Sequence, residues 1–210
     1  MNYIENIFIC LVVPLFIAAL CMRDRGRKMM LFLLAGMTAC LLSSYINTFV
    51  AVAKGMDAVS ASMEMSPMIE EMIKFLPILF YVLVFDPEKE DLADSVLMTS
   101  VGFATFENAC YLTSNGADQF IHLLIRGFGT GAMHVVCGFL FAVGLLYLWK
   151  QAWLRITGTI GLLSIASTYH GIYNILVSQT GTAALIGYLI PMLTVILSLL
   201  FFHNSSLFKD

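Results

Sequence analysis

Long apolar runs separated by short polar segments make up almost the whole chain. A helix needs about 20 apolar residues to cross the hydrocarbon core of a bilayer. By this measure the pattern predicts seven transmembrane helices, and we expect one all-α, polytopic membrane helix bundle over residues 1–210 with no soluble domain. The predicted spans are Tyr3 to Met22, Met29 to Ala53, Pro67 to Phe85, Ser95 to Thr113, Phe120 to Trp149, Ile156 to Val177 and Ala183 to Phe202.

The segment from Lys54 to Ser66 is polar compared with the runs on either side of it. It predicts either an external loop or a short surface helix. Pro67 follows, and proline suits the first turn of a helix because its missing N–H is not needed there. We therefore expect the third span to begin at Pro67.

Lysine and arginine are concentrated in every second connecting segment. Basic residues in short loops mark the cytoplasmic side of a membrane protein. One set carries only Lys54, so we expect the N-terminus outside the cell and the C-terminus inside. The other set carries Arg23, Arg25, Arg27, Lys28, Lys89, Lys150, Arg155 and Lys209.

Composition supports a membrane location. Hydrophobic residues make up 60% of the 210 residues and charged residues only 12%, which is more apolar surface than one water-soluble core can bury. The lipid bilayer is therefore a predicted partner, and nucleic acid is not. The five cysteines contain no CxxC pair, so we expect no disulfide framework.

Ionisable side chains interrupt four consecutive apolar spans. A charged side chain at bilayer depth costs roughly 2.5–3.5 kcal/mol, so such groups normally face a polar cavity and mark a functional site. The pattern therefore indicates a function as well as a location. The interrupting residues are Glu70, Glu71, Lys74, Glu107, His134 and His170.

The depth of these residues indicates one shared site. The 1.5 Å rise per helical residue places Glu107, His134 and His170 roughly 18 to 24 Å from the inner ends of their spans. Glu70 follows Pro67 by about one turn and so lies near the outer end of its span. All four fall in the outer half of the bilayer, although two of their helices run outward and two run inward.

Helical spacing predicts contacts within this site. Lys74 lies four residues after Glu70 and three after Glu71, so either carboxylate can pair with it on one helical face. His170 and Asn174 are four residues apart and face the same side of their helix.

The fifth span carries further polar and small residues. Arg126, at its outer end, is available to another carboxylate. Gly127 and Gly131 have the small-xxx-small spacing that permits close helix packing. This predicts a tight helix contact that holds His134 in place.

Four sequence elements, in this order, resemble the PrsW family of bacterial intramembrane proteases, which belongs to the clan of CAAX-processing endopeptidases. The resemblance implies an enzyme of the bacterial plasma membrane that cleaves a membrane-anchored protein, with an anti-sigma factor as the family's best-known substrate. It covers the third to sixth spans, residues 67–177. The elements are Glu70-Glu71-x-x-Lys74, Phe103-x-x-x-Glu107-Asn108, the Arg126 to His134 stretch ending in Gly138, and His170-Gly-x-x-Asn174.

The favoured mechanism uses no metal. Glu70, in preference to Glu71, acts with His134 as the general base on a water that attacks a peptide carbonyl. His170 and Asn174 then donate hydrogen bonds to the oxyanion. The predicted catalytic residues are Glu70, Glu71, Glu107, His134, His170 and Asn174, and the predicted supporting residues are Lys74, Asn108 and Arg126.

A metal-dependent mechanism is the alternative for the same residues. Glu107, His134 and His170 would bind zinc and leave Glu70 as the base, since three protein ligands and a water suffice for a catalytic zinc. The sequence has no HExxH motif. The three ligands would come from three different helices, so their spacing does not identify them.

Two functions other than proteolysis are alternatives for this chain. Buried Glu and His also build proton or ion pathways in transporters, but no inverted repeat is visible and the polar groups stop in the outer half. A non-catalytic scaffold is the second alternative, since a distant relative of this fold is the scaffolding subunit of the gamma-secretase complex. The outer-half site favours a protease that cuts a single-pass membrane protein near the extracytoplasmic border.

Overall fold

A computed structural model describes residues 4–115, 120–149 and 151–204, and the regular secondary structure in these ranges is α-helical. Tyr3, Lys150 and Lys209, which contributed to the predicted spans and orientation, lie outside the described residues. The helices are α1 (Ile4–Cys21), α2 (Asp24–Lys54), α3 (Ala58–Glu64), α4 (Ser66–Phe85), α5 (Lys89–Asn115), α6 (Phe120–Leu148), α7 (Ala152–Val177) and α8 (Thr182–Asn204).

Each predicted span corresponds to one long helix, and the polar segment before Pro67 contains the short helix α3. Helix α5 begins at Lys89 rather than at Ser95. The extra turns are polar, and Glu90 and Asp91 occupy the first turn, where negative charge is favourable to the exposed N–H groups of a helix. Hydropathy alone therefore placed the start of this helix too late.

Four of the described helices, α1, α2, α6 and α7, are long and apolar enough to cross a membrane. Helix α4 falls short of this measure because Glu70, Glu71 and Lys74 interrupt its apolar run. The chain is thus a multi-pass helical membrane protein. The count of seven spans and the outside position of the N-terminus stay predictions.

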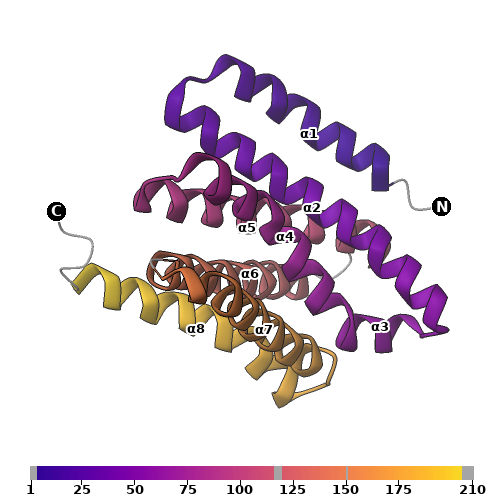
Figure 1. Cartoon of the computed structure of the whole chain (residues 1–210). Helices are drawn as coiled ribbons and strands as arrows, with labels where there is room; N and C mark the ends of the chain where they lie inside the picture. Colours follow the sequence, from indigo (N-terminus) through magenta and orange to yellow (C-terminus); the bar gives the residue numbers. More distant parts are fainter. Residues whose placement is uncertain (1–3, 116–119, 150, 205–210) are drawn as a thin grey trace.

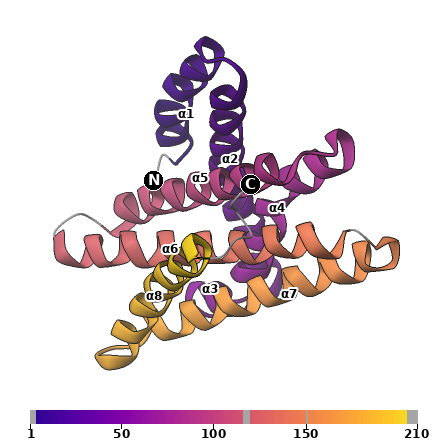
Figure 2. The same cartoon turned by 90° about the vertical axis from the view of Figure 1, so that its left-hand side faces the viewer.

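The helices form a bundle around α6. Helix α6 packs against α5, α7 and α8, and Figure 2 shows α5 above α6 with α7 along its other side. Helix α1 lies along α2 at one edge of the bundle (Figure 1). The start of α1 and the end of α8 lie at opposite ends of the bundle (Figure 1), an arrangement that suits termini on opposite sides of a membrane.

Helices α2 and α5 cross at very short range because two glycines face each other's backbone. A Cβ atom placed on Gly36 would lie 2.0 Å from the carbonyl oxygen of Thr99, and one on Gly102 would lie 2.0 Å from that of Leu33. No other residue fits at either position without separating the helices. The crossing fixes α2 and α5 relative to each other.

Ion pairs join the same two helices at one end. Lys28 Nζ lies 2.5 Å from Asp91 Oδ2, and Arg25 pairs with Asp94. The segment that joins α1 to α2 therefore lies at the same end of the bundle as the segment that joins α4 to α5. This agrees with the alternation of basic segments along the sequence.

The predicted close contact at Gly127 and Gly131 is wrong. Nothing lies within 4 Å of a Cβ atom placed on either glycine, and both line an open apolar groove of about 540 Å³ between α5, α6 and α8. Close approaches of α6 occur instead at Gly129, against the ring of Tyr188, at Gly138, against Ser100, and at Gly144, against Leu162. The four-residue spacing put both glycines on one face of α6, but it did not predict whether another helix packs against that face.

Two clusters of buried apolar side chains surround the polar residues. One cluster contains residues of each helix from α4 through α8. It includes Phe75 and Phe141, whose rings stack at 3.8 Å between centroids. The other joins α1, α2 and α5 and includes Phe103. The ammonium group of Lys74 lies between them, 5.1 Å from the ring centroid of Phe75 and 5.6 Å from that of Phe103.

Candidate functional site

Helix α4 directs its charged residues to the interior of the bundle. Pro67 lies in its first turn, and Glu71 and Lys74 follow one turn apart with no exposed side-chain surface. Lys74 Nζ lies 2.6 Å from Glu71 Oε2. Helical spacing offered Lys74 two acidic partners, and the structure pairs it with Glu71. Glu70 retains 16% exposure of its side chain.

Helices α6 and α7 bring two imidazole rings together. The rings of His134 and His170 are almost fully buried, with centroids 5.1 Å apart and planes at 86°. His170 Nδ1 lies 2.9 Å from Glu71 Oε1, and His134 Nε2 lies 2.5 Å from Glu107 Oε2. Each imidazole therefore has a carboxylate on one of its two nitrogens.

When each ring is neutral, this pairing determines which of its nitrogens carries the proton. A carboxylate only accepts hydrogen bonds, so the proton of His170 lies on Nδ1 and that of His134 on Nε2. The remaining nitrogens, Nε2 of His170 and Nδ1 of His134, then carry a lone pair that can accept a hydrogen bond or bind a metal. His134 Nδ1 lies 3.4 Å from Lys74 Nζ, and His170 Nε2 lies 3.8 Å from Glu70 Oε2.

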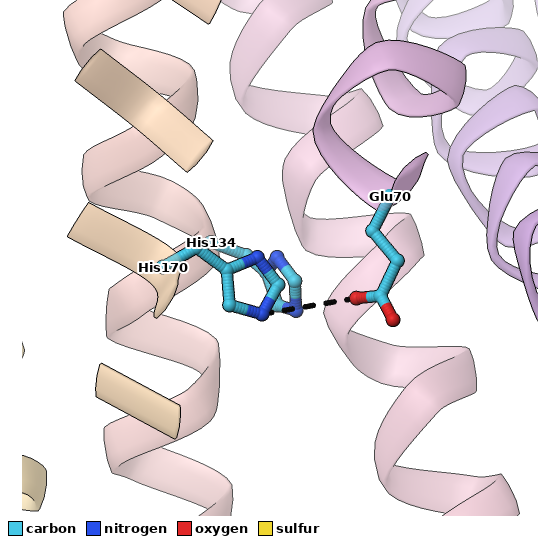
Figure 3. A group of neighbouring side chains, drawn as sticks. All are labelled: Glu70, His134 and His170. Carbon is cyan, nitrogen blue, oxygen red and sulfur yellow. Dashed lines mark ion pairs between the residues drawn. The ribbon is translucent and has the colours of Figure 1, made fainter. Parts of the chain in front are cut away.

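Glu70, His134 and His170 form a three-residue group that could hold a metal ion. Each offers one ligand atom, and these atoms lie within 4.8 Å of one another. The three side chains come from α4, α6 and α7 and point toward a common centre (Figure 3). We call this set the central trio.

The central trio differs from the zinc ligands expected from the sequence, which included Glu107 in place of Glu70. Glu107 has other contacts: its Oε2 faces His134 Nε2, and its Oε1 lies 3.4 Å from Arg126 Nη2. Arg126 in turn lies over the ring of Tyr111, 3.6 Å from its centroid. Glu107 thus supports His134 from outside the trio.

The two predicted asparagines lie away from the central trio. The amide nitrogen of Asn174 donates to the carbonyl oxygen of Ser62 at 3.0 Å and so joins α7 to α3. Asn108 lines the groove between α5, α6 and α8. For the residues that the structure describes, neither amide has a recorded contact with the trio. The oxyanion role of Asn174 and the supporting role of Asn108 stay predictions.

One residue of the site was missed by the sequence analysis. The amide nitrogen of Asn47, on α2, donates to Glu70 Oε1 at 3.1 Å. Asn47 is the one carboxamide within the apolar run from Met29 to Ala53. The available signal was a polar side chain inside a predicted span. The sequence analysis selected acidic, basic and histidine residues within the spans, and the run from Met29 to Ala53 has none.

The residues present fit a catalytic zinc site. Two histidines and one glutamate, with a position left for water, are a ligand set that catalytic zinc uses. Metal-binding imidazoles usually donate their second N–H to a carboxylate or carbonyl, and Glu71 and Glu107 accept from the two rings in this way. The donor chemistry and its support therefore both suit a divalent ion.

Comparison with known proteins places these features in a family. The sequence profile described as PrsW family intramembrane metalloprotease matches residues 25–201. This range runs from the first turns of α2 into α8 and contains every residue of the cluster described above. Comparisons with curated proteins and with solved structures gave no match.

Proposed function

The chain belongs to the PrsW family of intramembrane metalloproteases, and we propose that it hydrolyses a peptide bond of a membrane-anchored protein at Glu70, His134 and His170. The observation that carries the proposal is the convergence of these side chains from three helices within an apolar bundle. Burying ionisable groups is costly in a membrane protein, and such groups are retained where they work.

In this proposal the central trio binds a divalent metal ion, and zinc suits its donors best. When bound, such an ion polarises a peptide carbonyl and makes the proton of a bound water easier to remove. Glu71 holds the ring of His170, and Glu107 holds the ring of His134. Lys74 balances the charge of Glu71 at 2.6 Å.

In this proposal Glu107 is a positioning residue, because its Oε2 lies 2.5 Å from His134 Nε2, the ring nitrogen that faces away from the metal. It lies outside the central trio but contacts His134, and 28% of its side chain is exposed. Arg126 fixes its other oxygen at 3.4 Å.

The substrate we propose is a single-pass protein of a bacterial plasma membrane, of the anti-sigma-factor type. Glu70 lies four residues after Ser66, the first residue of α4. It is therefore roughly 6 Å from the start of the helix. With the predicted orientation this end faces outward, so the cut falls near the extracytoplasmic border.

The first prediction concerns the central trio. With a single-pass membrane protein that the wild-type chain cleaves, Glu70→Gln, His134→Ala and His170→Ala each lower kcat/KM about 10²-fold or more, because each removes a group that acts on the reacting atoms. Cleavage is measured with purified protein in lipid nanodiscs. Met72→Leu is the matched control, since Met72 lies on α4 beside Glu71 but is 44% exposed.

Metal dependence is tested on the same preparation. A chelator is expected to stop cleavage, and added zinc is expected to restore it. Cleavage unaffected by the chelator would instead favour the metal-free reaction with Glu70 as base. Wild-type rates in all three trio variants would remove the proposal in both forms.

A further inference from the structure

Asn47 connects the site to α2, a helix that contributes no residue to the four sequence elements. Its side chain is partly buried, and its amide nitrogen lies 3.1 Å from Glu70 Oε1. Cys40 and Ser43, which precede it by seven and four residues, are both buried. These spacings put the three residues on one face of the helix, which packs against α4 and α5.

The contact divides the two oxygens of the Glu70 carboxylate. Oε1 accepts from Asn47, whereas Oε2 faces Nε2 of His170 at 3.8 Å. A carboxylate held through one oxygen presents the other in a fixed direction. Asn47 therefore determines which oxygen of Glu70 is directed to the imidazoles. It binds Oε1, so Oε2 stays available to bind a metal.

The orientation of the amide follows from charge. If the amide were turned, its oxygen would face a carboxylate oxygen, and two acceptors would repel each other. The observed orientation places the buried Oδ1 of Asn47 where no residue that the structure describes donates to it. A buried acceptor without a donor costs about 1–3 kcal/mol. A residue retained only for packing has no reason to bear this cost.

We propose that Asn47 is a positioning residue, which binds Oε1 of Glu70 and thereby directs Oε2 to the central trio as a one-oxygen metal ligand. The inference rests on the proposed function and extends the site to a fourth helix, α2. Residues that hydrogen-bond a metal ligand typically change metal affinity or activity by about 10- to 100-fold when they are replaced. The effect expected for Asn47 is of this size.

The test compares three replacements of Asn47 in the full-length protein. Asn47→Leu keeps a similar side-chain shape without the donor, Asn47→Ala removes the side chain, and Asn47→Gln keeps an amide. Zinc affinity is measured by competition with a fluorescent chelator, and kcat and KM are measured on a cleaved membrane substrate. The matched control is Ser44→Ala, because the Ser44 hydroxyl donates to the Leu41 carbonyl of its own helix.

We expect Asn47→Leu and Asn47→Ala to weaken zinc binding and lower kcat by about 10- to 100-fold with KM nearly unchanged. Asn47→Gln should recover part of both losses, and Ser44→Ala should match the wild type. The absorption spectrum of the cobalt-substituted protein should change in Asn47→Leu, because one ligand is no longer held. The spectrum comes only from cobalt bound in the folded protein, so it tests the ligand geometry independently of cleavage.

Wild-type zinc affinity and kcat in Asn47→Leu and Asn47→Ala would overturn the inference. A lower unfolding temperature with unchanged zinc affinity and kcat would overturn it too, since packing alone would then explain the residue. These results leave the proposed function intact as long as Glu70→Gln is inactive. A wild type that binds no zinc would overturn the inference as well, because Glu70 would then not be a metal ligand.

Discussion

Lys74 and Glu71 show how the site accommodates buried charges. Both side chains are completely buried, and the ammonium group has a carboxylate at 2.6 Å and an imidazole nitrogen at 3.4 Å. The aromatic rings of Phe75 and Phe103 lie on its other sides. A buried charge is expensive to leave without its partner, whereas the loss of both charges costs far less.

The second prediction follows from this asymmetry. Lys74→Met should destabilise the protein by about 3–5 kcal/mol, because it leaves Glu71 charged and buried. The double variant Glu71→Gln with Lys74→Met should recover most of that stability but not the activity, because His170 loses the carboxylate on its Nδ1. Unfolding in detergent and proteolysis of a membrane substrate measure the two properties. A single variant as stable as the wild type would contradict this account.

At the scale of helices, the site depends on how α2 and α5 cross. Gly36 and Gly102 let the two backbones touch. The same two helices carry Asn47, which contacts Glu70, and Glu107, which contacts His134. The salt bridge between Lys28 and Asp91 holds the same two helices at their starts. A small separation of α2 from α5 would therefore move one support of Glu70 and the carboxylate partner of His134.

The third prediction tests this crossing. Gly36→Ala and Gly102→Ala should each destabilise the protein by about 1–3 kcal/mol or more, because the new methyl group meets backbone atoms that have no room to move. Gly161→Ala is the matched control, since nothing lies within 4 Å of a Cβ atom at that position of α7. It should be neutral or slightly stabilising, because alanine favours helix more than glycine does. Equal stability in all three variants would show that the crossing is not tight.

Sequence patterns predicted the contacts made within a helix better than those made between helices. Lys74 and Glu71 are neighbours because residues three apart share a helical face, and this pair was one of the two that the spacing allowed. The contact of Asn47 with Glu70 joins residues 23 positions apart on two helices, and no local spacing encodes it. The close contact predicted at Gly127 and Gly131 was wrong for the same reason. Spacing shows which residues share a face of a helix, but not which helix packs against that face.

For the whole molecule, the position of the site relative to the membrane determines what is cut. The ion pairs of α2 with α5 lie at one end of the bundle. The central trio is set nearer the other end, where α4 begins and α3 is joined to α7 by Asn174. A substrate helix has to unwind before its peptide bonds react. Its end is easier to unwind than its middle, because water satisfies the exposed backbone groups there.

The fourth prediction concerns the product. The new terminus of a cleaved single-pass protein should map to the extracytoplasmic border of its transmembrane helix, because the central trio lies in the outer half of the bundle in the predicted orientation. Mass spectrometry of the released fragment identifies the bond. A cut at the cytoplasmic border would contradict the orientation or the assignment of the site. Epitope tags on the two termini, tested for accessibility in intact cells, separate these explanations.

The origin of the central trio on three different helices has a consequence for biogenesis. Its glutamate comes from α4 and its histidines from α6 and α7, so a nascent chain that has inserted only its first half holds no complete set of donors. If the central trio is the catalytic site, hydrolysis requires that α6 and α7 have already docked against α4. On this proposal we expect a truncated or misassembled copy to leave neighbouring membrane proteins uncut, because it lacks part of the donor set.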